Sequence, residues 1–151
     1  MKLFVDTADI NEIREIAAWG VLAGATTNPS LLAQVEGSED EIYRSICETV
    51  NGPVSAEVVA DEPDLMISEG TRLAAIHPDI VVKLPTSPEG LIATSALAKK
   101  GIRVNMTLCF TASQALLAAA AGAAFVSPFV GRYDDIGNPG LEALRDVVDA
   151  L

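Results

Sequence analysis

The chain has only two cysteines and one histidine among its 151 residues. Cys47 and Cys109 are too few for a disulfide scaffold or a zinc site, and we interpret both as small core residues. The single histidine, His77, precedes Pro78 at an expected helix-to-strand junction, where a solvated helix end explains it. Neither residue type therefore predicts a metal site.

Positive charge is also scarce, since 10 Lys and Arg residues stand against 21 Asp and Glu, for a net charge of −11. This balance argues against a broad nucleic-acid surface, but it leaves room for one local cationic pocket that binds a small anion. The chain has no apolar run long enough to cross a bilayer and no basic leader followed by an apolar segment. We therefore expect a cytoplasmic protein that binds neither membranes nor nucleic acids.

Half of the residues are hydrophobic, and short β-like runs alternate with helix-like runs from one end to the other. No linker or change in composition divides the chain, so residues 1–151 are predicted to form a single domain. Helix starts are marked by capping-box spacings at Ser38/Glu41 and Thr111/Gln114. The predicted strands are 3–6, 21–25, 54–58, 80–84, 102–107 and 124–127.

Six strand–helix units of this length predict an α/β fold with parallel strands. Both an open doubly wound sheet and a (β/α)8 TIM barrel fit the alternation. The sequence has no G-x-G-x-x-G after its first strand, and its short regular units favour the barrel. A closed barrel needs eight units, so we expect about six units of a barrel that is incomplete at its C-terminal end.

Lys83 interrupts an otherwise apolar run, "DIVVKLP" (79–85). A charged amine in a buried strand is costly unless it is paired or neutral. The lysine stem could instead lie in the core while its head reaches water. A lysine in a dry site loses affinity for its proton, and its neutral amine attacks carbonyl carbon, so this strand favours Schiff-base chemistry.

Polar side chains also follow the other five strands. Ligands of parallel α/β folds bind beyond the carboxyl ends of the strands, so these side chains are expected to meet at one site. Each has a structural alternative, such as a helix cap for Asp6 or a solvated loop position for Arg132. The residues at these ends are Asp6, Thr27, Asn28, Glu57, Lys83, Asn105, Thr107, Ser127 and Arg132.

Two segments closely resemble the signature segments of the transaldolase family, and three more resemble other segments of that family in the expected order. The signature segments are "GATTNPSLL" (24–32) and "IVVKLPTSPEGLIA" (80–93), and the others are "LFVDTADINEI" (3–13), "NMTLCFT" (105–111) and "SPFVGRYDD" (127–135). The family consists of class I Schiff-base enzymes on a (β/α)8 barrel, which use neither a metal nor an organic cofactor. Its members continue through two more units, which complete the barrel and the phosphate site.

The resemblance implies a role for each matching residue. Lys83 matches the lysine that forms the Schiff base, and Asp6 matches the carboxylate that acts as general acid and base. Glu57 and Thr107 match the pair that holds a water molecule for proton transfer. The remaining matches bind substrate: Asn28 and Asn105 the dihydroxyacetone hydroxyls, Ser127 and Arg132 the phosphate, with Thr27 and Phe129 counted in the same substrate-binding set.

The family implies sugar-phosphate substrates and a homo-oligomer. It also includes fructose 6-phosphate aldolases, which resemble this chain less at Glu57, where they have glutamine, and at Phe129, where they have tyrosine. We therefore expect a transaldolase of the pentose phosphate pathway, which transfers dihydroxyacetone from sedoheptulose 7-phosphate to glyceraldehyde 3-phosphate. Two alternatives remain: an aldolase that releases free dihydroxyacetone, and an inactive barrel fragment that assembles with another chain.

Overall fold

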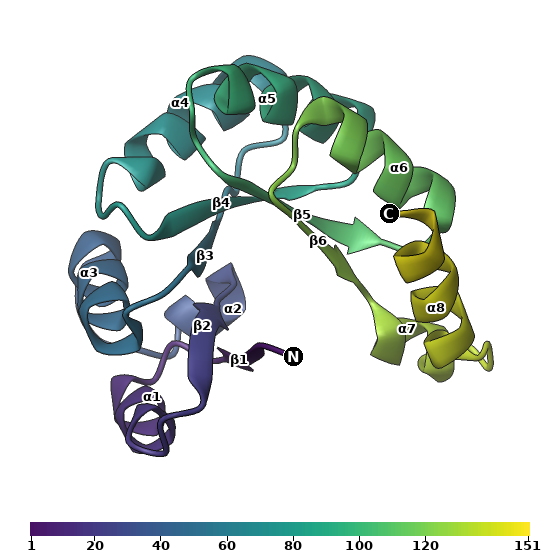
Figure 1. The fold of residues 1–151 in the computed structure, drawn as a ribbon. Coiled ribbons are helices and arrows are strands. Elements are labelled where there is room, and N and C mark those ends of the chain that lie inside the picture. Colours follow the sequence, from purple (N-terminus) through teal and green to yellow (C-terminus); the bar gives the residue numbers. More distant parts are fainter.

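Six parallel strands lie side by side in the order in which they follow one another along the chain. The computed structural model describes residues 1–151 (Figure 1). A doubly wound sheet would reverse its strand order at one point, whereas this order never reverses. The strands are β1 (Leu3–Asp6), β2 (Leu22–Thr26), β3 (Val54–Glu57), β4 (Ile80–Pro85), β5 (Val104–Cys109) and β6 (Phe125–Pro128).

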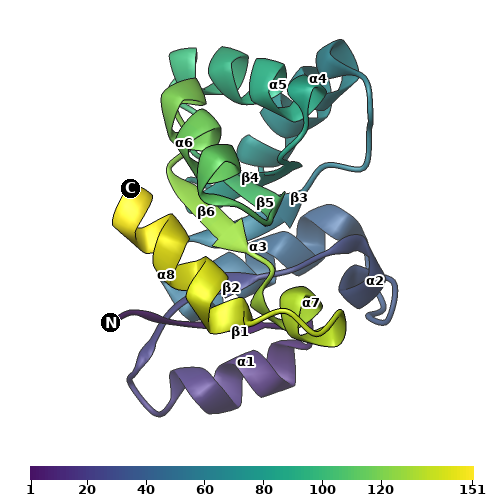
Figure 2. The same cartoon turned by 90° about the vertical axis from the view of Figure 1, so that its right-hand side faces the viewer.

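The sheet curls, with its helices outside the curve and its inner face open between β1 and β6 (Figures 1 and 2). This arrangement confirms a barrel-type fold of about six units. Phe4 of the first edge strand meets Phe125 of the last, with ring centroids 6.3 Å apart. The helices are α1 (Ile10–Ala17), α2 (Pro29–Leu32), α3 (Glu39–Val50), α4 (Pro63–Ala74), α5 (Pro88–Lys99), α6 (Ala112–Ala121), α7 (Val130–Asp135) and α8 (Gly140–Ala150).

Local capping sets the helix starts. Both predicted capping boxes are present: Ser38 with Glu41 at the start of α3, and Thr111 with Gln114 at the start of α6. The side chain of Ser87 accepts a hydrogen bond from the backbone N–H of Gly90 at the start of α5. These caps begin three of the outer helices, of which α5 follows β4 and α6 follows β5.

The structure differs from the predicted boundaries most at β5, which begins at Val104 and runs to Cys109. The strand is irregular near its end, because its register with β6 shifts between Met106 and Cys109 and Leu108 has a φ of 55°. Two short helices, α2 and α7, were not predicted. Helices of four and six residues are too short to show a helical period in the sequence.

The core lies between the outer face of the sheet and the helices. Alternate strand residues face outward, so Val82 and Leu84 of β4 pack into this layer while Lys83 faces the other way. Burying each large apolar side chain stabilises the fold by roughly 1.5–3 kcal/mol. Gly90 allows α5 to pass close to the end of β4, because a Cβ at this position would lie 1.9 Å from the carbonyl oxygen of Pro85. None of the helices has the length and apolar character needed to cross a membrane.

Cys47 and Cys109 are both free and buried, as the interpretation as core residues requires. Burial raises the pKa of the Cys47 thiol from its ordinary 9.0 to about 12, with smaller effects from Asp79 and Glu48. A raised thiol pKa stabilises the fold below pH 9, and this contribution is lost as the pH rises toward 12.

We therefore expect the free energy of unfolding to fall between pH 9 and 12, and to fall less steeply in Cys47→Ala. Urea unfolding midpoints measured at several pH values in this range test the prediction. If the urea midpoint falls equally steeply with pH in the wild type and in Cys47→Ala, Cys47 does not contribute to the pH dependence of stability.

Candidate active site

The strand register places the predicted polar residues on the inner face of the sheet. Lys83 of β4 pairs with Glu57 of β3 on one side and with Asn105 of β5 on the other. Asp6 of β1 pairs with Thr26 of β2, which pairs with Ser55 of β3. Register partners on neighbouring strands point to the same face, and residues two apart on one strand share it. One row on this face runs from Asp6 through Thr26 to Ser55, and the other runs from Glu57 through Lys83 to Asn105. Ser55 and Glu57 lie two residues apart on β3 and so join the two rows.

Lys83 lies at the centre of this face, with only 8% of the residue exposed. Its Nζ is 3.0 Å from Oε2 of Glu57 and donates a hydrogen bond of 3.0 Å to the backbone carbonyl of Thr27. The amine is therefore held by protein groups and does not extend into water.

Asn105 is held from both sides by serines. Its Nδ2 donates to Oγ of Ser55 at 3.0 Å, and its Oδ1 accepts from Oγ of Ser127 at 2.8 Å. These bonds set the orientation of the amide and leave one N–H free. Sequence reasoning missed Ser55, although its position two residues before Glu57 on the same strand face is a usable signal.

Asp6 and Thr107 complete the row of predicted residues that lie on the inner face. Thr26 donates to Oδ1 of Asp6 at 2.6 Å, which orients this exposed carboxylate. Oγ1 of Thr107 is buried and has no hydrogen-bond partner in the chain. A buried hydroxyl without a partner is costly, and a bound polar molecule or water would satisfy it.

The other predicted residues make different contacts. The hydroxyl of Thr27 points to Tyr43 and the Ser55 carbonyl, so only its own carbonyl faces Lys83. The side chain of Asn28 caps α2 through the N–H of Leu31. The ring of Phe129 packs against that of Phe110, with ring centroids 5.8 Å apart. The exposed side chain of Arg132 forms an ion pair with Asp135. The structure does not bring these four side chains into contact with Lys83.

A pocket of about 210 Å³ opens on the inner face beside Asn105. Its lining includes Thr26, Ser55 and Ser127, so a ligand in it would meet hydroxyl groups and the fixed amide. Phe4 and Phe125 form an apolar side of the same pocket. Lys83, Glu57 and Asp6 are not among the residues that line it, so the pocket adjoins the polar face on the Asn105 side.

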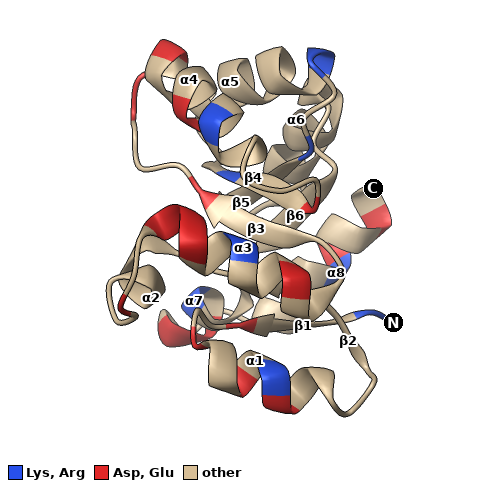
Figure 3. Ribbon diagram, turned by 90° about the vertical axis from the view of Figure 1, so that its left-hand side faces the viewer, with Lys and Arg blue, Asp and Glu red and all other residues tan.

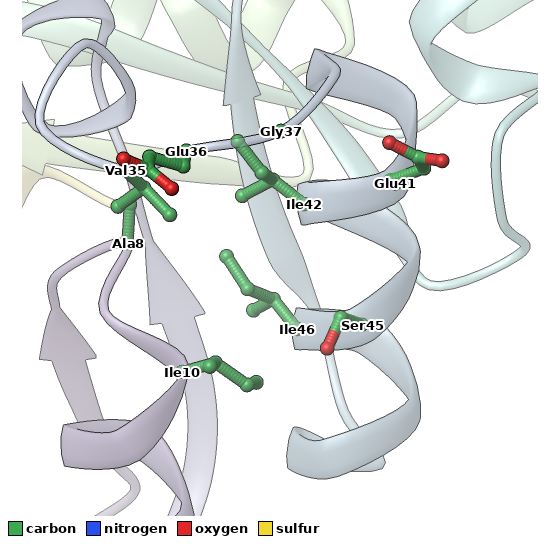
Figure 4. Close-up of a pocket in the computed structure, with 9 residues that line it drawn as sticks. All are labelled: Ala8, Ile10, Val35, Glu36, Gly37, Glu41, Ile42, Ser45 and Ile46. Carbon is green, nitrogen blue, oxygen red and sulfur yellow. The ribbon is translucent and has the colours of Figure 1, made fainter.

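A second pocket, of about 190 Å³, lies in the outer layer between α1 and α3 (Figure 4). Its charged side chains are Glu36 and Glu41, and it contains no Lys or Arg. Acidic residues also mark α1, α3 and α4 on the outside of the molecule (Figure 3). A phosphorylated ligand would be repelled there, so this pocket does not suit a sugar phosphate.

Comparison with known proteins identifies the family of this chain. A family model described as "Transaldolase/Fructose-6-phosphate aldolase" matches residues 3–150. A protein named "Probable transaldolase" from Thermus thermophilus is 59% identical, over 100% of this chain and 72% of its own length. Proteins of the same name from Desulforudis audaxviator and Caldicellulosiruptor saccharolyticus are 55% and 53% identical, over 99% and 98% of this chain and 69% and 68% of their own lengths.

Among solved structures, a thiamine phosphate pyrophosphorylase from Pyrococcus furiosus has a TM-score of 0.62 and 17% identity, over 99% of this chain and 70% of its own. At this identity the likeness shows the fold alone. The family assignment rests instead on the family model and the close relatives. Because the family model matches residues 3–150 and the named relatives are more than 50% identical over nearly the whole chain, the chain belongs to the transaldolase/fructose-6-phosphate aldolase family.

Proposed function

We propose that this protein is a transaldolase that transfers a dihydroxyacetone unit from sedoheptulose 7-phosphate to glyceraldehyde 3-phosphate. The observation that carries the proposal is the buried Lys83, held 3.0 Å from the Glu57 carboxylate on the inner face. A carboxylate at hydrogen-bond distance from an amine can accept its proton and return it later. The family membership supports sugar phosphates as the substrate class.

In the first half-reaction, the neutral amine of Lys83 attacks the ketose carbonyl at C2. Glu57 then returns a proton to the departing hydroxyl, so that water leaves and an iminium ion forms. A water molecule between Glu57 and the unpartnered hydroxyl of Thr107 would carry these protons. The free N–H of Asn105 is available to a hydroxyl of the dihydroxyacetone portion.

To complete the first half-reaction, Asp6 removes the proton from the C4 hydroxyl, and the C3–C4 bond breaks. Its electrons pass to the iminium nitrogen, erythrose 4-phosphate leaves, and an enamine remains on Lys83. In the second half-reaction, the enamine attacks the aldehyde carbon of glyceraldehyde 3-phosphate while Asp6 returns the proton to the new hydroxyl. Hydrolysis of the iminium releases fructose 6-phosphate.

One experiment tests this proposal directly. The protein is incubated with fructose 6-phosphate, reduced with borohydride and examined by peptide mass spectrometry for an adduct on Lys83. Adding erythrose 4-phosphate then distinguishes transfer, which yields sedoheptulose 7-phosphate, from aldol cleavage, which releases dihydroxyacetone. A folded protein without an adduct would contradict the proposal for this chain and favour an inactive fragment that assembles with another chain.

A change at Arg132 tests the proposed phosphate site. Arg132 is exposed and pairs with Asp135, so its guanidinium is free to exchange that partner for a phosphate. A charge-assisted hydrogen bond contributes at least about 1.5 kcal/mol, so Arg132→Ala is expected to raise KM for sugar phosphates roughly tenfold and to change kcat little. Steady-state kinetics beside Arg145→Ala, an exposed arginine on α8, provide the control. Equal KM values in the two variants would remove Arg132 from the site.

A further inference from the structure

Lys83 is held by two groups that belong to two different strands. The Glu57 carboxylate extends from the end of β3, and the Thr27 carbonyl lies just after β2. Both contacts measure 3.0 Å. The direction of the amine therefore depends on how well the ends of β2 and β3 are held relative to each other.

Tyr43 of α3 lies behind this junction, on the outer side of the sheet. It is fully buried; Oγ1 of Thr27 donates to the Ser55 carbonyl at 3.0 Å and shares a hydrogen bond of 3.3 Å with the Tyr43 hydroxyl. Burial raises the pKa of Tyr43 to about 12, so the hydroxyl stays protonated and can both donate and accept. Tyr43 thus contacts Thr27, one of the two residues that contact Lys83, and Thr27 in turn bonds to β3, the strand that carries Glu57.

We propose that Tyr43 is a positioning residue for Lys83: its hydroxyl holds Thr27, the residue that bonds to β3 through the Ser55 carbonyl and accepts a hydrogen bond from the Lys83 amine. Tyr43 touches neither substrate nor the reacting nitrogen and acts only through Thr27. The proposal rests on the proposed function, because aiming the amine matters for attack on a carbonyl. A small loss of alignment at a nucleophile costs rate more than binding.

The test uses Tyr43→Phe, which removes the hydroxyl and keeps the ring. Thr94→Val is the matched control, because Thr94 is equally buried on α5 and its hydroxyl has no partner. In Tyr43→Phe we expect the borohydride-trapped adduct on Lys83 to form roughly fivefold more slowly, the effect of losing one ordinary hydrogen bond. KM is expected to stay unchanged, and Thr94→Val should behave as the wild type.

Two labelling measurements separate positioning from loosening of the helix. Acetic anhydride labelling of Lys83, relative to exposed Lys99 and Lys100, is expected to rise roughly fivefold in Tyr43→Phe, because the amine is held less firmly. Alkylation of buried Cys47, one turn further along α3, should stay at the wild-type rate.

Unchanged Lys83 acetylation in Tyr43→Phe would overturn the inference, and so would a parallel rise in Cys47 alkylation, because the effect would then be loss of packing. If the wild-type protein forms no adduct, the proposed function fails. The acetylation comparison still decides whether Tyr43 positions Lys83.

Discussion

Replacing Lys83 by methionine is expected to abolish the borohydride-trapped adduct and to lower turnover by at least about 10⁴-fold, because no other group can form the covalent intermediate. Methionine has a similar length and suits the apolar strand, so the fold is expected to persist. The measurements are adduct mass and steady-state kinetics. Lys99→Met, at an exposed position on α5, is the control and should retain both signals.

The same variant also has a predicted effect on stability. Removing Lys83 leaves the Glu57 carboxylate without its partner, and a partly buried charge without a partner is destabilising. Glu57 is about a quarter exposed, so water offsets part of this cost. Adding Glu57→Gln to Lys83→Met should restore part of the free energy of unfolding, measured by urea denaturation. Residual adduct in the single variant would contradict the assignment of the nucleophile.

Replacing Asp6 by asparagine is expected to leave the Schiff base intact and to lower turnover by about 10²–10⁴-fold, the usual contribution of general acid–base catalysis. The amide oxygen of asparagine can still accept the hydrogen bond that Thr26 donates at 2.6 Å, so the geometry of the site should survive. Only the ability to take and return a proton is lost. The trapped adduct should therefore accumulate at normal levels while product formation falls.

Asp9→Asn is a suitable comparison for this variant. Asp9 is exposed, caps α1 through the N–H of Asn11, and an asparagine can replace it in that role. Its turnover should match that of the wild type. Wild-type turnover in Asp6→Asn would refute the acid–base role, and loss of the adduct would place Asp6 earlier in the reaction.

Much of the site could be predicted from strand ends. Because parallel strands bring their carboxyl ends to one edge, Asp6, Glu57, Lys83 and Asn105 were expected to share a face, and the register places them there. The expectation for Arg132 came from its place after the sixth strand and from the resemblance, which assigned it to the phosphate. Its contact in the structure is with Asp135, so its role stays a prediction.

The sequence by itself determined the alternation of strands and helices, the capping boxes at Ser38 and Thr111, and an unusual lysine in a buried strand. These are local properties, since side-chain periodicity and caps depend on residues a few positions apart. The tertiary structure alone decided the strand order, the irregular end of β5 and the contacts of Lys83. The carbonyl of Thr27 and the hydroxyl of Tyr43 carry no distinctive sequence signal, because their roles depend on packing between segments far apart in the chain.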